Sequence, residues 1–326
     1  MSEYWQAGLP DELTVPETVP GQRPLDLSDS DLMFNLILYA VPYFVALLAI
    51  EWISFHHTGD HDEAMGGYDV RDTATSLSMG LGNLFINLGW KLVVVVIYTA
   101  VYELTPLRVP SDAWWAWVLL FFADDVAYYW FHRISHEVRV FWASHVVHHS
   151  SQHYNLSTAL RQTWVPMTYL PFWLPLALIG IPPWMIILQQ SVSLVYQFGI
   201  HTERVGRLWQ PLEFVFNTPS HHRVHHGANQ QYLDRNYGGI LIIWDRMFGS
   251  FAGETERVRY GLTKNIETHH PVRVAFHEYI AIGRDLRAAR GWRQRWGYVF
   301  RGPGWSPAPP PRAGAPDTDG AVATSR

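Results

Sequence analysis

The sequence has no cysteine among its 326 residues. This absence excludes disulfide bonds, thiolate zinc sites, iron–sulfur clusters and thiolate-ligated haem. A metal ion bound by the chain would therefore take its ligands from histidine, aspartate or glutamate. Lysine is also scarce, since only Lys91 and Lys264 occur among 24 basic residues. The formal net charge is −5 and the pI about 6.4, so nucleic acid is not expected as a partner.

Long apolar segments interrupt a chain whose mean hydropathy is close to zero. They occupy residues 34–53, 77–101, 113–131, 163–180 and 182–200, and the last two are joined by a Gly-Ile-Pro-Pro turn. Crossing the hydrocarbon core of a bilayer takes about 20 apolar residues. Tryptophan and tyrosine near the ends of such runs are typical of membrane interfaces. The pattern predicts an all-α integral membrane bundle of about four to five membrane helices; buried helices of a large soluble protein are the alternative.

The distribution of arginine predicts an orientation. Residues 1–33 and 102–112 each carry one basic residue, whereas residues 132–162 and the chain from 201 onward are rich in arginine. The positive-inside rule places the arginine-rich segments in the cytoplasm. No basic region precedes the first apolar run, so we expect no signal peptide, and this run would act as an uncleaved anchor.

The composition divides the chain into three parts. We expect an acidic N-terminal tail over residues 1–33, a membrane domain over residues 34–302, and a disordered tail rich in proline and alanine over residues 303–326. Within the domain, residues 284–301 combine tryptophan and phenylalanine with six arginines, five of which lie between positions 284 and 295. This segment predicts a helix lying on an anionic membrane surface, or alternatively a solvated helix.

Histidine, in contrast, is clustered. HRISH supplies His132 and His136, whereas HVVHH and HRVHH each supply three histidines spaced i, i+3 and i+4. Residues three and four apart share one face of a helix, so each cluster would present its imidazoles in one direction. His201 follows the last apolar run, and all these segments meet the same predicted membrane–cytoplasm boundary. The candidate metal ligands are His132, His136, His145, His148, His149, His201, His221, His222, His225 and His226.

So many imidazoles predict a metal site. Crowded basic groups lower each other's pKa and favour the neutral form that binds metal. The ligands are too many for one ion and suit two. Nitrogen ligation fits iron, zinc or copper, but catalytic zinc normally needs only three protein ligands. A dinuclear iron centre that reacts with oxygen at a membrane surface is the better chemical match.

The three boxes resemble those of the fatty acid hydroxylase / sterol desaturase superfamily of integral-membrane di-iron oxygenases. The stretches DDVAYYWFHRISHE, HVVHHSSQHYNLSTALRQT, QFGIHTE and NTPSHHRVHHGANQQYLDRNYGGILIIWDRMFGSF are similar to its alkylglycerol monooxygenase branch. The resemblance covers residues 118–252. It implies a helical membrane protein with a cytosolic, histidine-rich helical cap that holds two irons.

The resemblance assigns roles to individual residues. The eight box histidines match the ligand motifs, and His201 matches a ligand between the second and third boxes. His221 lies about 100° away from the face of the third box and is a ligand or a neighbour of one. Glu137 follows the first box and is a candidate catalytic residue that either orients an imidazole or binds iron. Asp124 and Asp125, and also Asn155, Asp234, Asn236 and Asp245, could support a ligand histidine or serve structure alone.

The predicted function is hydroxylation of an alkyl C–H bond of a lipid with O2 and an external reductant. The branch implies oxidation of the ether-linked carbon of an alkylglycerol with tetrahydrobiopterin; a sterol or fatty-acyl hydroxylase or desaturase fed by ferredoxin or cytochrome b5 is the alternative. The electron donor would be a separate partner. A metal transporter is a third possibility, but transporters place their ligands near the bilayer midplane, and the histidines here lie beyond the predicted membrane exits.

Overall fold

The computed structural model describes residues 27–57 and 67–307, with side chains from residue 40 onward. Most of both predicted tails lies outside these residues. The described chain is all-helical and contains no β-strand; Phe216 and Leu241 form an isolated antiparallel bridge. The helices are α1 (Leu27–His57), α2 (Val70–Glu103), α3 (Trp114–Glu137), α4 (Arg139–His149), α5 (Leu170–Leu178), α6 (Pro183–Gly199), α7 (Gln210–Val215), α8 (Pro219–His225), α9 (Ile243–Phe248), α10 (Pro271–Ala288) and α11 (Trp292–Phe300), with 3-10 turns at Thr158–Leu160 and Pro166–Tyr169.

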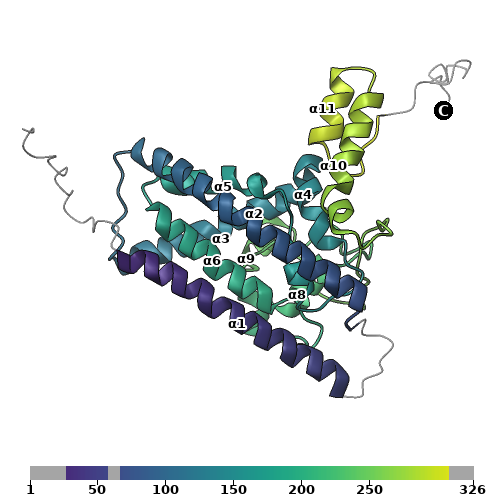
Figure 1. Cartoon of the computed structure of the whole chain (residues 1–326), viewed down its shortest axis with the longest axis horizontal. Coiled ribbons are helices and arrows are strands. Elements are labelled where there is room, and N and C mark those ends of the chain that lie inside the picture. The colour runs from purple at the N-terminus through teal and green to yellow at the C-terminus, as the bar shows by residue number, and fades with distance from the viewer. Residues whose placement is uncertain (1–26, 58–66, 308–326) are drawn as a thin grey trace, which may run out of the picture.

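The long helices form a bundle, and the histidine-bearing segments gather at one end of it. Figure 1 shows α1, α2 and α6 running along the bundle, with α8 near the end where α1 finishes and α2 begins. Helices α2, α3, α5 and α6 pack together around a core that includes Tyr98, Leu120, Trp173 and Ile186. These side chains contact one another between the four helices, and this packing holds the bundle together.

Helix α2 is the described helix that is long and apolar enough to cross a membrane. It begins at an N-cap, where the side chain of Asp69 accepts a hydrogen bond of 2.8 Å from the backbone N–H of Asp72. Leu84, Leu88 and Leu92 are exposed along its length. A buried core helix would cover such residues, so their exposure distinguishes α2 from the core helix of a soluble protein.

Two predicted helices differ from the observed ones. The apolar segment 163–180 contains only the short helix α5 after a 3-10 turn. Pro166, Pro171 and Pro175 lack the backbone N–H that a continuous helix needs, and a nine-residue helix is only about 14 Å long. This apolar segment is therefore not one continuous helix, and with α6 it forms the pair around the Gly-Ile-Pro-Pro turn. Residues 284–301 form the end of α10 and all of α11, because the chain leaves the helix between Ala288 and Trp292.

Candidate metal centre

The first two histidine boxes lie on consecutive helices that meet at a sharp break. His132 and His136 occupy the last turns of α3, and α4 carries His145, His148 and His149. Val138, between the helices, has an extended backbone with φ −123° and ψ 118°. A turn at this residue lets α4 fold back against α3, and the two helices pack together.

The third box and His201 lie on later segments of the chain, on α8 and just after α6. Pro219 occupies the first turn of α8, where its missing N–H costs no intrahelical hydrogen bond. His222 and His225 lie within α8, and His226 is its C-cap residue. His201 directly follows Ile200, the C-cap residue of α6.

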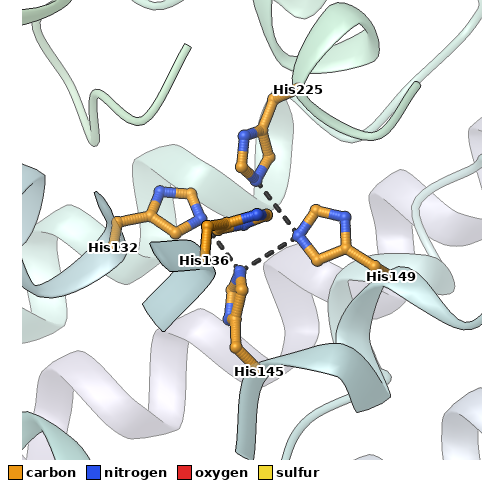
Figure 2. A group of neighbouring side chains, drawn as sticks. All are labelled: His132, His136, His145, His149 and His225. Carbon is orange, nitrogen blue, oxygen red and sulfur yellow. Dashed lines mark hydrogen bonds between the residues drawn. The ribbon is translucent and has the colours of Figure 1, made fainter. Parts of the chain in front are cut away.

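The structure brings nine of the ten predicted ligands into two adjoining groups. In each group, one ligand atom from every member lies within 4.8 Å of those of all the others. Figure 2 shows the imidazoles of the larger group pointing toward one another. The two groups adjoin because the rings of His149 and His226, one from each, stack with their centroids 4.4 Å apart. The five-histidine group contains His132, His136, His145, His149 and His225; the four-histidine group contains His148, His201, His222 and His226.

Backbone carbonyls set the proton position on three of these imidazoles. Nδ1–H of His132 donates to the carbonyl oxygen of Tyr237 at 2.8 Å, and Nδ1–H of His225 donates to that of Arg235 at 2.9 Å. Nδ1–H of His201 donates to the carbonyl oxygen of Gln197 at 2.6 Å. A neutral imidazole with its proton on Nδ1 has a free lone pair on Nε2. These three Nε2 atoms are therefore prepared to bind metal.

The spacing of the Nε2 atoms fits a bound metal ion. Nε2 of His132 lies 2.9 Å from that of His145, and Nε2 of His225 lies 3.1 Å from that of His149. In the other group, Nε2 of His201 is 2.9 Å from that of His222. Two nitrogens bound at right angles, each about 2.1 Å from one ion as in zinc sites, lie about 3.0 Å apart. Both groups therefore match neighbouring ligands of a metal ion.

Two imidazoles carry a buried Nε2 atom with no hydrogen-bond partner in the described chain. They are those of His136, in the five-histidine group, and His226, in the four-histidine group. A buried polar atom without a partner costs free energy. A metal ion in each group would provide that partner, so the donor set fits the metal that the sequence predicts.

Burial favours the neutral form of most of the clustered imidazoles. It lowers the pKa of His201 to about 4. For six others, burial lowers the pKa well below the usual value of a histidine, and the neighbouring imidazoles lower it further because they disfavour a second positive charge; these are His145, His148, His149, His222, His225 and His226. Neutral imidazole is the form that binds metal.

Two buried carboxylates hold the loop that contacts His132 and His225. Asp245 accepts backbone N–H groups from Tyr237 and Gly238, each at 2.7 Å. Asp125, on α3, accepts the backbone N–H groups of Ile240 and Leu241 and the indole N–H of Trp244. The two aspartates thus fix the carbonyls of residues 235–237 rather than contacting an imidazole themselves. Neither aspartate contacts a histidine side chain directly. Both instead hold the loop whose carbonyl oxygens accept hydrogen bonds from His132 and His225.

Further supporting residues cannot be placed beside the site from their local sequence. Glu51, buried on α1, accepts hydrogen bonds from the hydroxyls of Tyr68 and Thr202 and from the backbone N–H of Leu156. Thr202 directly follows His201, so α1 is tied to a candidate ligand. The ring of Tyr154 stacks against that of His201 with the centroids 5.8 Å apart. Only the fold brings these residues to the site.

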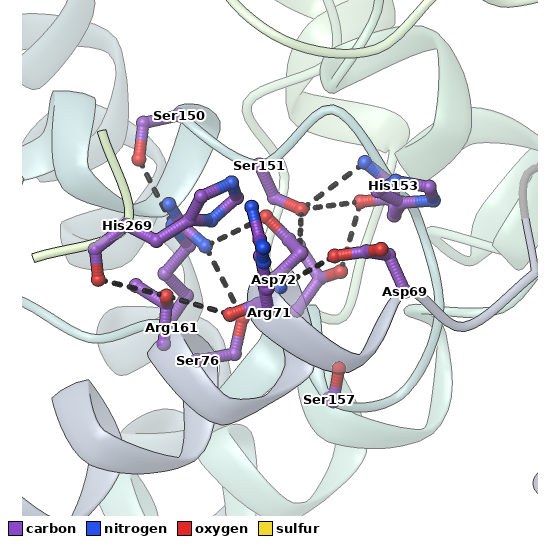
Figure 3. A network of polar contacts seen from close by, with 12 residues as sticks. Asp69, Arg71, Asp72, Ser76, Ser150, Ser151, His153, Ser157, Arg161 and His269 are labelled. Atoms are coloured by element: carbon purple, nitrogen blue, oxygen red, sulfur yellow. Dashed lines mark hydrogen bonds and ion pairs between the residues drawn. The ribbon is translucent and has the colours of Figure 1, made fainter. Parts of the chain in front are cut away.

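A buried polar network joins the start of α2 to the turn after the second box (Figure 3). The guanidinium of Arg161 pairs with the carboxylate of Asp72 at 2.9 Å and donates to the hydroxyl of Ser150 at 2.9 Å. Ser151 also donates to Asp72, at 2.6 Å. Ser150 follows His149 in the chain. The network therefore links the candidate membrane helix to the helix that carries three candidate ligands.

Two predicted site residues are not brought to either group. Nε2 of His221 lies 3.0 Å from the carboxylate of Glu213, and His221 belongs to neither cluster. Glu137 pairs instead with Arg133 at 2.9 Å, on a partly exposed stretch of α3. The i,i+4 spacing of these two residues on one helix explains the pairing.

The other polar candidates have mixed positions. Asp234 lies 3.7 Å from Nδ1 of His136, which is too long for a hydrogen bond. Asp124 accepts the indole N–H of Trp173 at 2.6 Å. The side chain of Asn236 donates to the carbonyl oxygens of His221 and Ala252. Asn155 donates to the carbonyl oxygen of Gly67. The contact of Asp124 joins α3 to α5, and those of Asn155 and Asn236 hold the surrounding loops; neither kind contacts an imidazole.

Fold and site together define a class of protein: an all-helical chain that buries two adjoining sets of imidazoles, each able to hold a metal ion. Residues 117–250 match the family described as fatty acid hydroxylase. This match contains all nine clustered histidines. This part of the chain is thus similar to fatty acid hydroxylases, as the histidine boxes predict.

The chain is similar to alkylglycerol monooxygenases. It is 43% identical to that of Homo sapiens over 274 residues, which cover 83% of this chain and 60% of the human protein. It is 36% identical to that of Caenorhabditis elegans over 238 residues, which cover 72% of this chain and 46% of the nematode protein. A more distant relative is the ornithine lipid hydroxylase OlsE of Rhizobium tropici, 30% identical over 135 residues, or 38% of each chain. This chain thus spans less than two thirds of the length of these relatives. No solved structure is significantly similar to it.

Proposed function

We propose that the chain is a membrane-bound lipid hydroxylase that uses O2 and two iron ions. The observation that carries this proposal is the pair of adjoining histidine groups, with Nε2 atoms spaced as ligands of a metal ion. The five-histidine group and the four-histidine group would each hold one ion. Bound iron would supply the activation of dioxygen that an unactivated C–H bond requires.

The protein itself would orient the ligands and exclude water. The carbonyls of Tyr237, Arg235 and Gln197 hold three imidazoles in the tautomer that leaves Nε2 free. Burial of the histidine groups removes competing water. Asp125 and Asp245 keep the loop before α9 in place. No role follows for Glu137 or His221, so neither is included among the catalytic residues or ligands.

The substrate class is a lipid with an alkyl chain, and the similarity to alkylglycerol monooxygenases favours an ether-linked one. Oxidation of the carbon next to the ether oxygen would insert one atom of O2 into a C–H bond. The other atom would leave as water, using two protons and two electrons from an external reductant. Tetrahydrobiopterin is the reductant that the branch implies, and ferredoxin or cytochrome b5 is the alternative. Removal of two hydrogens instead would give a desaturase.

The histidine groups would face the cytoplasm. Helix α2 is a candidate membrane span, and its first residues lie at the same end of the bundle as α8 (Figure 1). Under the positive-inside rule, the arginine-rich segments 132–162 and 201 onward would lie on the cytoplasmic side. The proposed topology retains further spans in α1, α3 and the α5–α6 pair.

Paired histidine variants test the metal site. His148→Ala removes a member of the four-histidine group, whereas His221→Ala removes a neighbouring histidine outside both groups. Purified from membranes and loaded with iron, the first variant should hold fewer iron ions per chain and lose turnover. The second should retain both. Full iron content and turnover in His148→Ala would refute the proposed site.

Isotope labelling tests the reaction. The iron-loaded protein is incubated with an alkylglycerol lipid, a reductant and ¹⁸O2, and the products are analysed by mass spectrometry. Incorporation of one ¹⁸O atom supports hydroxylation. A product that has lost two hydrogens without label would show desaturation, and the absence of any oxidised lipid together with exchangeable metal would favour transport.

A further inference from the structure

Helices α10 and α11 form an arm that stands away from the bundle. Figure 1 shows the two helices side by side at one edge of the molecule, with their axes crossing the direction of α2. The two helices pack against each other, and α10 also packs against α4 and α2. We propose that the exposed face of this α10–α11 arm (residues 271–300) binds the surface of an anionic lipid membrane.

Large aromatic side chains form a stripe along α11. Trp292 is 73% exposed, Trp296 58% and Phe300 44%. Their i, i+4 and i+8 spacing places them on one face of the helix, and the rings of Trp296 and Phe300 lie 4.2 Å apart. The opposite face is packed, since Gly297 is buried beside the ring of Trp305. Tryptophan in particular favours the level of the lipid headgroups, where its ring is apolar and its N–H remains hydrated.

Arginines flank this stripe on both sides. At about 100° per residue, Arg293 lies on one side of the line through Trp292 and Trp296, and Arg295 lies on the other. Both are exposed, as are Arg284, Arg287 and Arg290 at the same end of the arm. Apolar residues between cationic ones are the arrangement of a helix that lies in a membrane interface.

The acidic residues of the arm do not neutralise these arginines. Glu278 and Asp285 both pair with Arg139, at 2.7 Å and 2.6 Å. In the part of the chain that the structure describes, no carboxylate forms an ion pair with the five exposed arginines, from Arg284 to Arg295. Their charge is therefore available to an anionic surface. Each basic residue near such a surface adds attraction that falls off within about a Debye length.

The arm is joined directly to the helices of the metal centre. Arg139 is the first residue of α4, its side chain is buried, and its backbone N–H donates to the carbonyl oxygen of Arg301 at 3.0 Å. The ion pairs of Arg139 with Glu278 and Asp285 add a second connection. An arm bound to the membrane surface would therefore set the height of α4, and hence of the histidine groups, relative to the lipid. This inference needs a membrane but does not depend on the proposed reaction.

The absence of cysteine permits a direct measurement of depth. Trp296→Cys introduces a single attachment site on the stripe, and Gln230→Cys introduces one on an exposed loop elsewhere. The full chain of each variant carries a nitroxide label and is placed in nanodiscs of phosphatidylcholine alone or of phosphatidylcholine with phosphatidylglycerol. Electron paramagnetic resonance then compares the access of O2, which partitions into lipid, with that of a water-soluble nickel complex.

The label at position 296 should be protected from nickel and accessible to O2, more strongly when phosphatidylglycerol is present. The label at position 230 should remain accessible to nickel in both lipids. Adding Arg287→Gln, Arg293→Gln and Arg295→Gln to Trp296→Cys should abolish the difference between the two lipids, while the iron content stays unchanged. This last result separates the arm from the metal site.

Two outcomes would overturn the proposal. Equal nickel access at positions 296 and 230 in both lipids would show that the stripe remains in water. Protection at position 296 that persists in detergent, with spin–spin broadening between labels, would show that the stripe contacts a second copy of the chain instead.

Discussion

The imidazole of His132 donates from Nδ1 to the carbonyl oxygen of Tyr237 at 2.8 Å. The backbone N–H of Tyr237 in turn donates to Asp245 at 2.7 Å. A candidate ligand on α3 is thereby held by a loop more than 100 residues later in the chain, as the separation of 105 positions shows. The orientation of this imidazole depends on the loop and on the carboxylates that hold it.

Asp125→Asn should weaken metal binding, whereas Asp124→Asn should not. The carboxylate of Asp125 accepts N–H groups from Ile240, Leu241 and Trp244, and an amide in its place offers only one acceptor oxygen. The loop that contacts His132 would loosen, and metal affinity should fall by about 10-fold, the lower range for residues that orient ligands. Asp124 accepts from Trp173 instead.

The two variants are compared by competition with a metal chelator and by the absorption spectrum of a bound cobalt probe. An equal loss of affinity in both would mean that any substitution in this part of α3 disturbs the site. Asp124→Asn serves as the matched control because the two residues are neighbours on the same helix.

Asp72→Asn should strongly destabilise the fold. Arg161 is 1% exposed and pairs with Asp72 at 2.9 Å, so the substitution leaves a buried guanidinium without its counter-charge. Breaking a buried pair in this way costs about 3–5 kcal/mol in the free energy of unfolding. The temperature of thermal unfolding should fall markedly, and metal content should fall with it because Arg161 also holds Ser150, next to His149.

Two further variants test this explanation. Glu103→Gln removes the exposed partner of Arg108 and should change the unfolding temperature little, since exposed pairs contribute little to stability. Asp72→Leu combined with Arg161→Met removes both charges and should recover part of the stability lost in Asp72→Asn. A double variant less stable than Asp72→Asn would contradict the role given to the unpaired charge.

Gly180→Ala should disrupt the turn between α5 and α6. Gly180 has φ +88°, a conformation that disfavours side chains. A Cβ atom there would also overlap the backbone of Leu107 and Arg108. Gly249, with φ +76°, has no atom within 4 Å of such a Cβ, so Gly249→Ala measures the conformational cost alone, about 1–2 kcal/mol.

Thermal unfolding of the two alanine variants in the same detergent distinguishes the two costs. Gly180→Ala should lower the unfolding temperature clearly more than Gly249→Ala. Equal shifts would show that the loop of Leu107 moves aside without cost.

The supporting residues illustrate why part of the site was beyond sequence reasoning. A carboxylate in an apolar segment needs a partner, which makes Asp125 a candidate, and Asp245 is one because it lies in a stretch similar to the family. Glu51 also lies in an apolar segment, but the local sequence assigns neither Glu51 nor Tyr154 to the site, because nothing in it shows that α1 or the chain after α4 lies beside His201. Glu137 directly follows the first histidine box, which suggests a role at the site, but its carboxylate pairs with Arg133 one turn earlier.

The apolar segments show a similar division. Residues 77–101 predict a long apolar helix, and α2 contains all of them. Residues 163–180 are one apolar segment by composition, but three prolines limit its α-helix to the short helix α5. Hydropathy counts apolar residues and does not count missing backbone N–H groups.

The spacing of the histidines predicts which of them share a helical face, because separations of three and four residues are local properties of a helix. The division of each box between the two groups follows from the packing of the helices instead. In HVVHH, His145 and His149 join the five-histidine group and His148 the other; in HRVHH, His222 and His226 join the four-histidine group and His225 the other. In both boxes the i and i+4 residues belong to the same group, and the i+3 residue belongs to the other group. Which group each face meets depends on the packing of α3, α4, α6 and α8 across the centre, and such contacts between distant segments are not encoded in the spacing of any one box.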